Sequence, residues 1–346
     1  MFLLLCCIYS NLQAQNNDLN KIRTEKKELS DKQAEVNKAL ENALFQNISN
    51  NIKSIGYPKI GKEEELVTHC AMALAFNPIH KQAAWVMHII PRDIKFAKND
   101  RTNDFRVDSL VTKGCALEKD YFLRFHILEK KDSFFSFGYD RGHLAPSADF
   151  LWSKKAMSES FFYSNMSPQI PEFNEGKWAE LENNVREYVK NKGNTDVYVI
   201  TAPLLEKNLP TLKSDNHVSI PNFYYKIVLD TTNKQGIAFI MPNRAIYEEP
   251  IGYFACTIDS IEKLTGYDFF PNLDKKLQQQ LESKFDMSLW QAKVSKFSAI
   301  PINPKKLKPG QCNTLDAKKF IGTYKQVCGT LISVSGNNIK YMRILG

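Results

Sequence analysis

Apolar positions along this chain recur with two spacings, which predict where strands and helices lie. Short runs rich in apolar and β-branched residues predict strands, and these runs lie at 67–76, 84–90, 196–205, 222–230 and 236–241. Apolar positions three or four residues apart predict helices, at 153–162, 176–192, 258–264 and 273–284. Residues 98–135 are charged and show no regular spacing. Because strands and helices do not alternate regularly, the sequence predicts an α+β fold.

The first part of the chain predicts a charged helix. Residues 17–54 are rich in Lys, Glu, Asn and Gln, and Ile22, Leu29, Val36 and Ala43 follow one another at intervals of seven. This spacing gives a weak apolar seam of the kind that coiled coils use. The favoured interpretation is a solvated helix that packs loosely on the main body.

Residues 1–14 (MFLLLCCIYSNLQA) are apolar and end in a small residue, which is the pattern of a secretory signal peptide, although its start lacks basic residues. The run is too short for a membrane span, which needs about 20 apolar residues. We therefore expect a secreted or periplasmic protein with no membrane span. Export would leave an odd number of cysteines, of which Cys312 and Cys328 could bridge.

Positive charge is concentrated in the last part of the chain. The formal net charge is +8, and residues 291–346 hold 10 of the 46 Lys and Arg residues but only one of the 38 Asp and Glu residues. This segment either tethers a polyanion or carries an ordinary solvated lysine face. It contains a Pro- and Lys-rich linker at 301–309, and short strands are expected at 321–324, 327–334 and 338–341. The predicted organisation is a helical segment at 15–60, a main domain at 61–290 and a basic, strand-rich module at 291–346.

The stretch FGYDRGHLAPSAD, at 137–149, carries the first candidate chemistry. Hydrolysis of a phosphodiester needs a base for the attacking water, and positive charge for the phosphorane and the leaving oxygen. His143 is the candidate base because an imidazole titrates near neutral pH. A hydrogen bond at one ring nitrogen fixes the tautomer, and we expect Asp140 and Arg141, flanking a glycine turn, to brace the ring.

The second candidate element is a helix in the segment 164–189. Asn174, Trp178, Glu182 and Arg186 recur at steps of four, which places them along one helical face. An Asn carbonyl with several waters suits Mg²⁺, Glu182 is placed to hold metal-bound water, and Arg186 to face a phosphate. The alternative is an amphipathic surface helix with an Asn cap and a Glu182–Arg186 pair. When this helix is considered together with His143, the metal-site interpretation is favoured over the surface helix.

These residues belong to longer motifs with a family resemblance. The motifs are Asp140-Arg141-Gly142-His143-Leu144-Ala145-Pro146, Ser164-Asn165-Met166-Ser167-Pro168-Gln169 and Phe173-Asn174-x-Gly176-x-Trp178-x-x-Leu181-Glu182-x-x-x-Arg186. Further matches run from about Val67 to about Glu282 and include Pro221-x-x-Tyr224-Tyr-Lys226. The sequence resembles the DNA/RNA non-specific endonucleases of the ββα-metal, or His-Me finger, class. The resemblance implies a ββα-metal core with a central mixed or antiparallel sheet flanked by helices.

The resemblance also implies a role for each matching residue. His143 would be the general base, and Asn174 the one direct protein ligand of Mg²⁺, with Mn²⁺ or another divalent cation as alternatives. Glu182 would orient metal-bound water, Arg186 would contact the phosphate, and Asn165 would help to hold the site together. An upstream arginine would stabilise the phosphorane; Arg101 is the first choice, and Arg106 is the alternative.

The implied activity is metal-dependent cleavage of DNA and RNA with little sequence preference. DNA and RNA are the expected substrates, and an inhibitor protein is a candidate partner that the sequence leaves open. Two alternatives remain: a secreted protein that binds or scavenges nucleic acid without cutting it, and a phosphodiesterase for another phosphorylated substrate. The remaining histidines show no ligand-like spacing, which argues against a multi-histidine zinc site. His69 is expected to be a core residue with a satisfied ring. The oligomeric state stays open.

Overall fold

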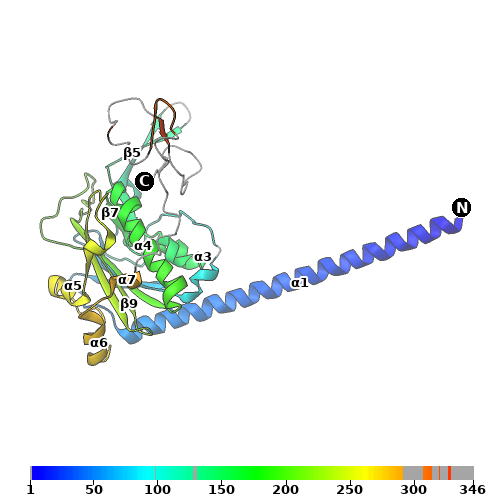
Figure 1. Ribbon diagram of the computed structural model, residues 1–346, viewed down its shortest axis with the longest axis horizontal. Helices are drawn as coiled ribbons and strands as arrows, with labels where there is room; N and C mark the ends of the chain where they lie inside the picture. Colours follow the sequence, from blue (N-terminus) through cyan, green and yellow to red (C-terminus); the bar gives the residue numbers. More distant parts are fainter. Residues whose placement is uncertain are drawn as a thin grey trace. The chain divides into compact units, whose positions relative to one another are not determined.

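Seven strands form one antiparallel sheet at the centre of the fold (Figure 1). In spatial order they are β1 (Glu65–Thr68), β2 (Met72–Asn77), β3 (Gln82–Ile90), β8 (Val197–Pro203), β9 (Phe223–Asp230), β10 (Gln235–Pro242) and β11 (Ala255–Cys256). The predicted strands are confirmed with one correction, because the run at 67–76 holds two strands. The backbone N–H of His69 donates to the carbonyl of Met72 at 2.8 Å, which closes the turn between them.

This computed structural model describes residues 2–97, 99–127, 131–290, 307–313, 319 and 326–328. The chain divides into two compact units, residues 1–290 and 291–346. The division falls where the sequence analysis placed the start of the basic module. The sheet and its helices belong to the first unit.

The predicted helices are also present. The longer ones are α1 (Phe2–Ile55), α3 (Lys154–Ser160), α4 (Ala179–Glu187), α5 (Ile258–Thr265) and α6 (Lys275–Glu282), with the short helices α2 (Glu118–Tyr121) and α7 (Met287–Trp290). Irregular helical segments adjoin α4 on both sides, η4 (Phe173–Trp178) and η5 (Tyr188–Gly193). Short 3-10 turns are η1 (Arg92–Phe96), η2 (Ser147–Phe150), η3 (Tyr163–Asn165) and η6 (Ile251–Phe254).

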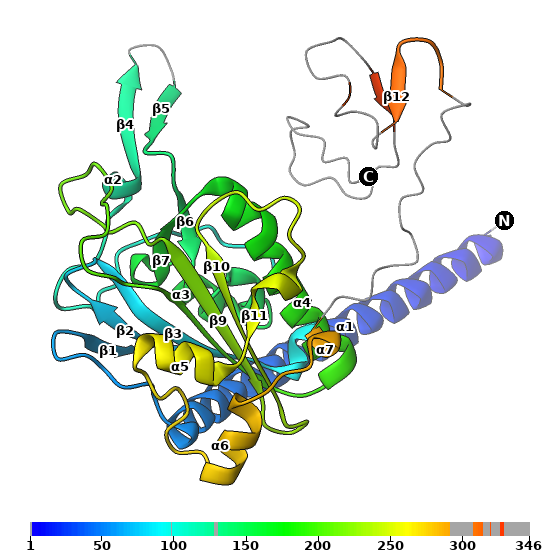
Figure 2. The same ribbon diagram turned by 60° about the vertical axis from the view of Figure 1, so that its left-hand side comes forward.

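Helices cover both faces of the sheet, as the side chains of β9 establish. Tyr224 lies with its ring centroid 5.9 Å from that of Trp178, at the start of α4. Tyr225 is its neighbour in the strand and lies 5.8 Å from Phe269, in the connection between α5 and α6. Because successive side chains of a strand point to opposite faces, α4 covers one face and the α5–α6 pair covers the other (Figure 2).

Two small pairs of strands lie outside the main sheet. Strands β4 (Phe122–Ile127) and β5 (Lys131–Ser136) pair within the segment 98–135, for which no regular structure was expected. A two-stranded sheet with charged residues in both strands lacks the long apolar alternation that identifies a buried strand, so the sequence did not reveal it. Strands β6 (Asp140–His143) and β7 (Met166–Gln169) form the second pair and carry the candidate chemistry.

The expected charged helix is confirmed, and α1 also includes the residues read as a signal peptide. Ile48, Ile52 and Ile55 in its last turns are buried, whereas Ile22 and Leu29 are exposed. The C-terminal part of α1 therefore packs on the main body, from about Phe45, whose ring centroid lies 5.4 Å from that of Trp152. Within the described residues, no helix combines the length and apolar character that a membrane crossing requires.

The second unit is described only in part. Strands β12 (Gln311–Asn313) and β13 (Gln326–Cys328) pair in parallel, and β13 overlaps the strand expected at 327–334. The strands expected at 321–324 and 338–341 lie outside the described residues. Cys312 is buried and free, and the side chain of Cys328, with which the sequence left a bridge open, lies outside the described part of the structure.

Candidate active site

Strands β6 and β7 are antiparallel, and Asp140 pairs with Gln169 while His143 pairs with Met166. The expected glycine turn is wrong, because Gly142 lies inside β6. A Cβ atom at Gly142 would lie 2.1 Å from Oε1 of Gln169, whose side chain is fully buried. A glycine is therefore required here by close approach of the neighbouring strand rather than by a turn.

His143 is the last residue of β6, and its ring packs against two aromatic rings. Its centroid lies 4.8 Å from that of Phe161 and 5.7 Å from that of Phe105. The Nε2 atom is buried and has no hydrogen-bond partner among the described residues. Burial, together with the positive charges of Arg101 and Arg141, lowers the pKa of His143 to about 3. The imidazole is therefore neutral at pH 7 and can accept a proton.

Asn165 fixes the backbone that follows His143. Its Oδ1 accepts a hydrogen bond from the backbone N–H of Ala145 at 2.9 Å. Its Nδ2 donates to the carbonyls of Ala145 at 2.9 Å and of Ser160 at 2.7 Å. A fully buried amide with three such bonds holds the loop after β6 against η3 and α3.

Arg141 does not contact His143 as a hydrogen-bonding brace. Its guanidinium lies 3.6 Å from the ring centroid of Phe105 and 4.7 Å from that of Phe122, and Nη1 donates to the hydroxyl of Tyr163 at 3.4 Å. Stacking on aromatic rings holds the cation near the imidazole. Its charge then acts on the pKa of His143.

The two candidate upstream arginines differ in their surroundings. The guanidinium of Arg101 lies 5.0 Å from the Phe161 ring, the ring that His143 also contacts. Arg106 instead donates to Oδ2 of Asp104 at 2.8 Å and to the carbonyl of Ser158 at 2.7 Å. Arg101 is thus placed beside the imidazole, whereas Arg106 is engaged in structural hydrogen bonds.

Asp140 contacts Asn174 rather than His143. The Nδ2 atom of Asn174 donates to Oδ2 of Asp140 at 2.8 Å. The expectation that Asp140 braces the imidazole is therefore wrong. Instead, Asp140 fixes the amide of Asn174, whose Oδ1 accepts no hydrogen bond within the described part of the chain. Asn174 belongs to η4, where the non-helical conformation of Gly176 interrupts the helix before α4 begins.

Glu182 projects from α4, and 12% of its side chain is exposed. Its carboxylate accepts no hydrogen bond from the described residues, and Nζ of Lys226 lies 4.0 Å from Oε1. Burial raises the pKa of Glu182 to about 7, although the charges of Lys226, Arg186 and Arg101 oppose the rise. A free carboxylate oxygen therefore lies close to three cations.

Arg186 has a carboxylate partner inside the protein. Its Nη1 donates to Oδ1 of Asp149 at 2.8 Å, and Oδ2 of Asp149 is 2.9 Å from Nε2 of His88. One donor of Arg186 is thus committed to a buried ion pair, and the remaining face of the guanidinium is the part left for a phosphate. The Asp149–His88 contact lies behind it, with His88 fully buried.

Sequence reasoning assigned no role to Lys226, Asp149 or Gln169. Lys226 is buried, and its Nζ donates to Oγ1 of Thr201 at 2.5 Å. Its positive charge partly balances the negative charge of the Glu182 carboxylate. The sequence pattern that could have revealed Lys226 is a single lysine in an otherwise apolar strand, because a buried ammonium needs an acidic partner. Gln169 is buried with neither amide atom bonded to a described residue. Its position opposite Asp140 became visible only when β6 and β7 paired.

The residues fit a hard divalent cation. Asn174 offers a carbonyl oxygen whose amide nitrogen is already held by Asp140, and Glu182 offers a carboxylate without a hydrogen-bond donor. Oxygen donors with room for several waters suit Mg²⁺, which dehydrates reluctantly. Asn174 would be the direct ligand and Glu182 would act through water.

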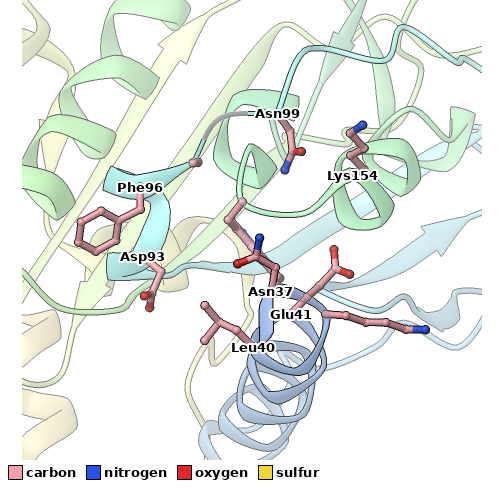
Figure 3. A pocket seen from close by; sticks show the side chains of 10 residues that line it. Asn37, Leu40, Glu41, Asp93, Phe96, Asn99 and Lys154 are labelled. Carbon is pink, nitrogen blue, oxygen red and sulfur yellow. The ribbon is translucent and has the colours of Figure 1, made fainter. Parts of the chain in front are cut away.

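A pocket of about 500 Å³ lies elsewhere, between α1 and the segments around η1 and α3 (Figure 3). Its labelled lining residues are Asn37, Leu40, Glu41, Asp93, Phe96, Asn99 and Lys154. None of the candidate catalytic residues lines it, so it is not the catalytic site. His69 is a satisfied core residue as expected, since its Nε2 lies 3.0 Å from Oδ2 of Asp108.

Comparison with known proteins shows the family to which the chain belongs. The model of the DNA/RNA non-specific endonuclease family matches residues 48–276. A nuclease from Syncephalastrum racemosum is 32% identical over 273 residues, which cover 72% of this chain and 80% of that protein. Mitochondrial endonuclease G from Homo sapiens is 31% identical over 226 residues, covering 60% of this chain and 70% of that protein.

Among solved structures, that of the EndoG/EndoGI complex matches with a TM-score of 0.55 and 26% identity. The match covers 67% of this chain and 94% of that chain. The antiparallel sheet flanked by helices and the match to EndoG show the fold of a nuclease of the ββα-metal class. The chain belongs to the DNA/RNA non-specific endonuclease family and is a hydrolase. Nucleases of this family depend on a divalent cation.

Proposed function

We propose that this nuclease cleaves DNA and RNA with little sequence preference, with His143 as general base and Mg²⁺ held by Asn174. The observation that carries the proposal is the state of the His143 imidazole. It is neutral, its buried Nε2 has no partner among the described residues, and two arginines lie beside it. A neutral imidazole has a lone pair for the proton of the attacking water, and the arginines beside it supply positive charge for the phosphate.

Each nearby residue has a part in this proposal. The imidazole of His143 accepts the proton of the attacking water, and the guanidinium of Arg101 faces the charge that develops on the phosphorane. Oδ1 of Asn174 is the protein ligand of the cation, Glu182 holds water beside it, and the free face of Arg186 contacts the phosphate. A bound divalent cation supplies positive charge for the leaving oxygen.

Lack of sequence preference follows from what these groups can recognise. They are cations, an imidazole and oxygen ligands that address phosphate, and phosphate contacts carry no base information. We further propose that residues 1–14 are a signal peptide and that the protein acts outside the cytoplasm. A broadly acting nuclease endangers the cell that makes it, and the EndoG/EndoGI complex is one case of inhibition. An inhibitor protein is therefore the proposed partner.

Incubation of supercoiled plasmid with purified protein tests the proposal. With Mg²⁺ we expect nicked and then linear DNA, with EDTA intact DNA, and with His143→Ala a loss of about 10²–10⁴-fold in rate. Binding without nicking would favour the nucleic-acid-scavenging alternative. Faster hydrolysis of small phosphodiesters than of plasmid or RNA would favour a phosphodiesterase with another substrate. Near-normal cleavage by a folded His143→Ala variant would reject the assigned base.

A further inference from the structure

Three carboxylates gather between α5 and α6, away from the candidate active site. Asp259 and Glu262 are three residues apart on α5, and Glu282 is the last residue of α6. One oxygen from each lies within 4.8 Å of the other two. Oxygens at this spacing can share one cation at the bond lengths of about 2.3–2.6 Å that Ca²⁺ adopts.

The state of Glu282 is the second, independent observation. This residue is only 3% exposed, and its side chain accepts a hydrogen bond from that of Gln278, but its Oε1 has no hydrogen-bond partner among the described residues. A buried carboxylate oxygen without a donor is costly unless a cation or a proton compensates it. Burial and the charges of Glu262, Asp259 and Asp268 raise the pKa of Glu282 to about 8.

The charges around the cluster are mostly negative. Asp268 also faces it and accepts a hydrogen bond from Nε2 of Gln278 at 2.9 Å. Lys275 is the cation that acts on Glu262, but its Nζ donates to Oε1 of Gln278 at 3.1 Å. The structure supplies Glu262 with one further donor, the backbone N–H of Phe269 at 3.0 Å. Among the groups that act most on the pKa of Glu282, the charged ones are the carboxylates of Glu262, Asp259 and Asp268.

We propose that Asp259, Glu262 and Glu282 bind one Ca²⁺ that fastens α5 to α6. The three donors are all carboxylate oxygens, so the site does not suit metals that prefer sulfur ligands. Ca²⁺ accepts six to eight oxygens in flexible geometry, whereas Mg²⁺ demands a near-ideal octahedron. The exposed side of Asp259 leaves room for the waters that complete the shell.

This site is distinct from the catalytic one. Lys226 and Glu182 meet on the face of the sheet that α4 covers, whereas α5 and α6 pack on the other face. Both helices lie close to β10 at Gly236. A Cβ there would lie 2.3 Å from the carbonyl oxygen of Leu281 in α6 and 3.1 Å from Cδ1 of Ile258 in α5. Ca²⁺ binding would thus change stability and leave the chemistry of His143 unaltered.

Thermal unfolding of the full chain tests the proposal. After removal of metals with EDTA, millimolar Ca²⁺ should raise Tm by about 5 °C. The Asn174→Ala variant, which lacks the proposed catalytic ligand, should show the same rise. Glu282→Gln should show a rise below about 1 °C. Its Tm in EDTA should equal or exceed that of the wild type, because the carboxyl of Glu282, with its pKa raised to about 8, must take up a proton on folding at neutral pH and glutamine need not.

A second variant guards against a folding defect in Glu282→Gln. Asp259 is exposed, so Asp259→Asn should fold and yet weaken the Ca²⁺-dependent rise. Cleavage of plasmid with Mg²⁺ should be unchanged in both variants, which separates this proposal from that for the catalytic site. No rise in the wild type, an equal rise in Glu282→Gln, or a Glu282-dependent rise with Mg²⁺ and not with Ca²⁺ would each overturn the Ca²⁺ site.

Discussion

The side chains of Asn174 and Asp140, 34 residues apart in the sequence, meet in a hydrogen bond of 2.8 Å in which the amide nitrogen donates. The bond fixes which end of the Asn174 amide is available, because the nitrogen is held and the carbonyl oxygen is left for another partner. It also ties η4 to the strand that ends in His143. A residue that orients a ligand in this way controls affinity for the cation without touching it.

Removal of the Asp140 carboxylate should therefore weaken the cation site. For Asp140→Ala we expect the Mg²⁺ concentration for half-maximal cleavage to rise by about 10–100-fold, with activity largely restored at saturating Mg²⁺. Asp140→Asn, which keeps an acceptor oxygen, is the matched control and should lie nearer the wild type. A Mg²⁺ titration of plasmid cleavage measures both. Unchanged Mg²⁺ dependence in Asp140→Ala would contradict the orienting role.

Replacement of Arg101 should affect mainly catalysis, whereas replacement of Arg106 should affect mainly stability. Arg101 shares the Phe161 ring with His143, so Arg101→Ala should lower kcat/KM by about 10²–10³-fold with little change in Tm. Arg106 is held by Asp104 and by the Ser158 carbonyl. Its replacement by Ala should cost about 1–2 kcal/mol of unfolding free energy and leave kcat/KM near normal. The opposite pattern would reassign the phosphorane-stabilising arginine to Arg106.

Gly142 should tolerate no side chain while Gln169 is present. In Gly142→Ala the new Cβ would meet Oε1 of Gln169 at 2.1 Å, so the strands must separate. We expect a loss of about 1–3 kcal/mol in unfolding free energy and reduced cleavage, because β6 carries His143. The double variant with Gln169→Ala should recover stability. Gly252→Ala is the control. Its new Cβ would lie 3.4 Å from Cγ of the flexible Met287 side chain, so we expect little change in unfolding free energy.

The lowered pKa of His143 should appear in the dependence of stability on pH. Below about pH 6.5 the unfolded chain binds a proton at this imidazole that the folded chain, with a pKa of about 3, does not bind. Its contribution to stability is therefore full above pH 6.5 and is lost as the pH falls towards 3. Between pH 7 and pH 5 the loss is about 2 kcal/mol. Urea unfolding of His143→Asn should lack this part of the decrease, and an identical pH dependence would show that His143 is not held neutral.

The basic tail should affect binding of nucleic acid more than catalysis. A chain that ends at Trp290 keeps the contact of that ring with Tyr188, at 4.1 Å between centroids, and loses 10 Lys and Arg residues. We expect the slope of log Kd against log salt to become less steep by about two or more. Cleavage of a short oligonucleotide at saturation should be unchanged. An unaltered salt slope would assign those lysines to an ordinary solvated face.

The sequence determined which elements form and which motif carries the base. The main helices and the strands of the central sheet follow from local spacing of apolar residues, since each must bury one face. His143, Asn174 and Glu182 were recognisable because they lie in compact motifs whose spacing is local. Lys226 and Asp149 received no role from the sequence for the opposite reason, because each finds its charged partner on another element.

Only the tertiary structure decided how those motifs meet. Neither the partner of Asp140 nor the different surroundings of Arg101 and Arg106 can be read from chain order, because both depend on side chains that approach from distant segments. The same holds for Glu282, which becomes a buried oxygen beside Asp259 and Glu262 only when α6 packs on α5. Local patterns fix elements, whereas the pKa of a group and the partners it finds depend on burial and on neighbours in space.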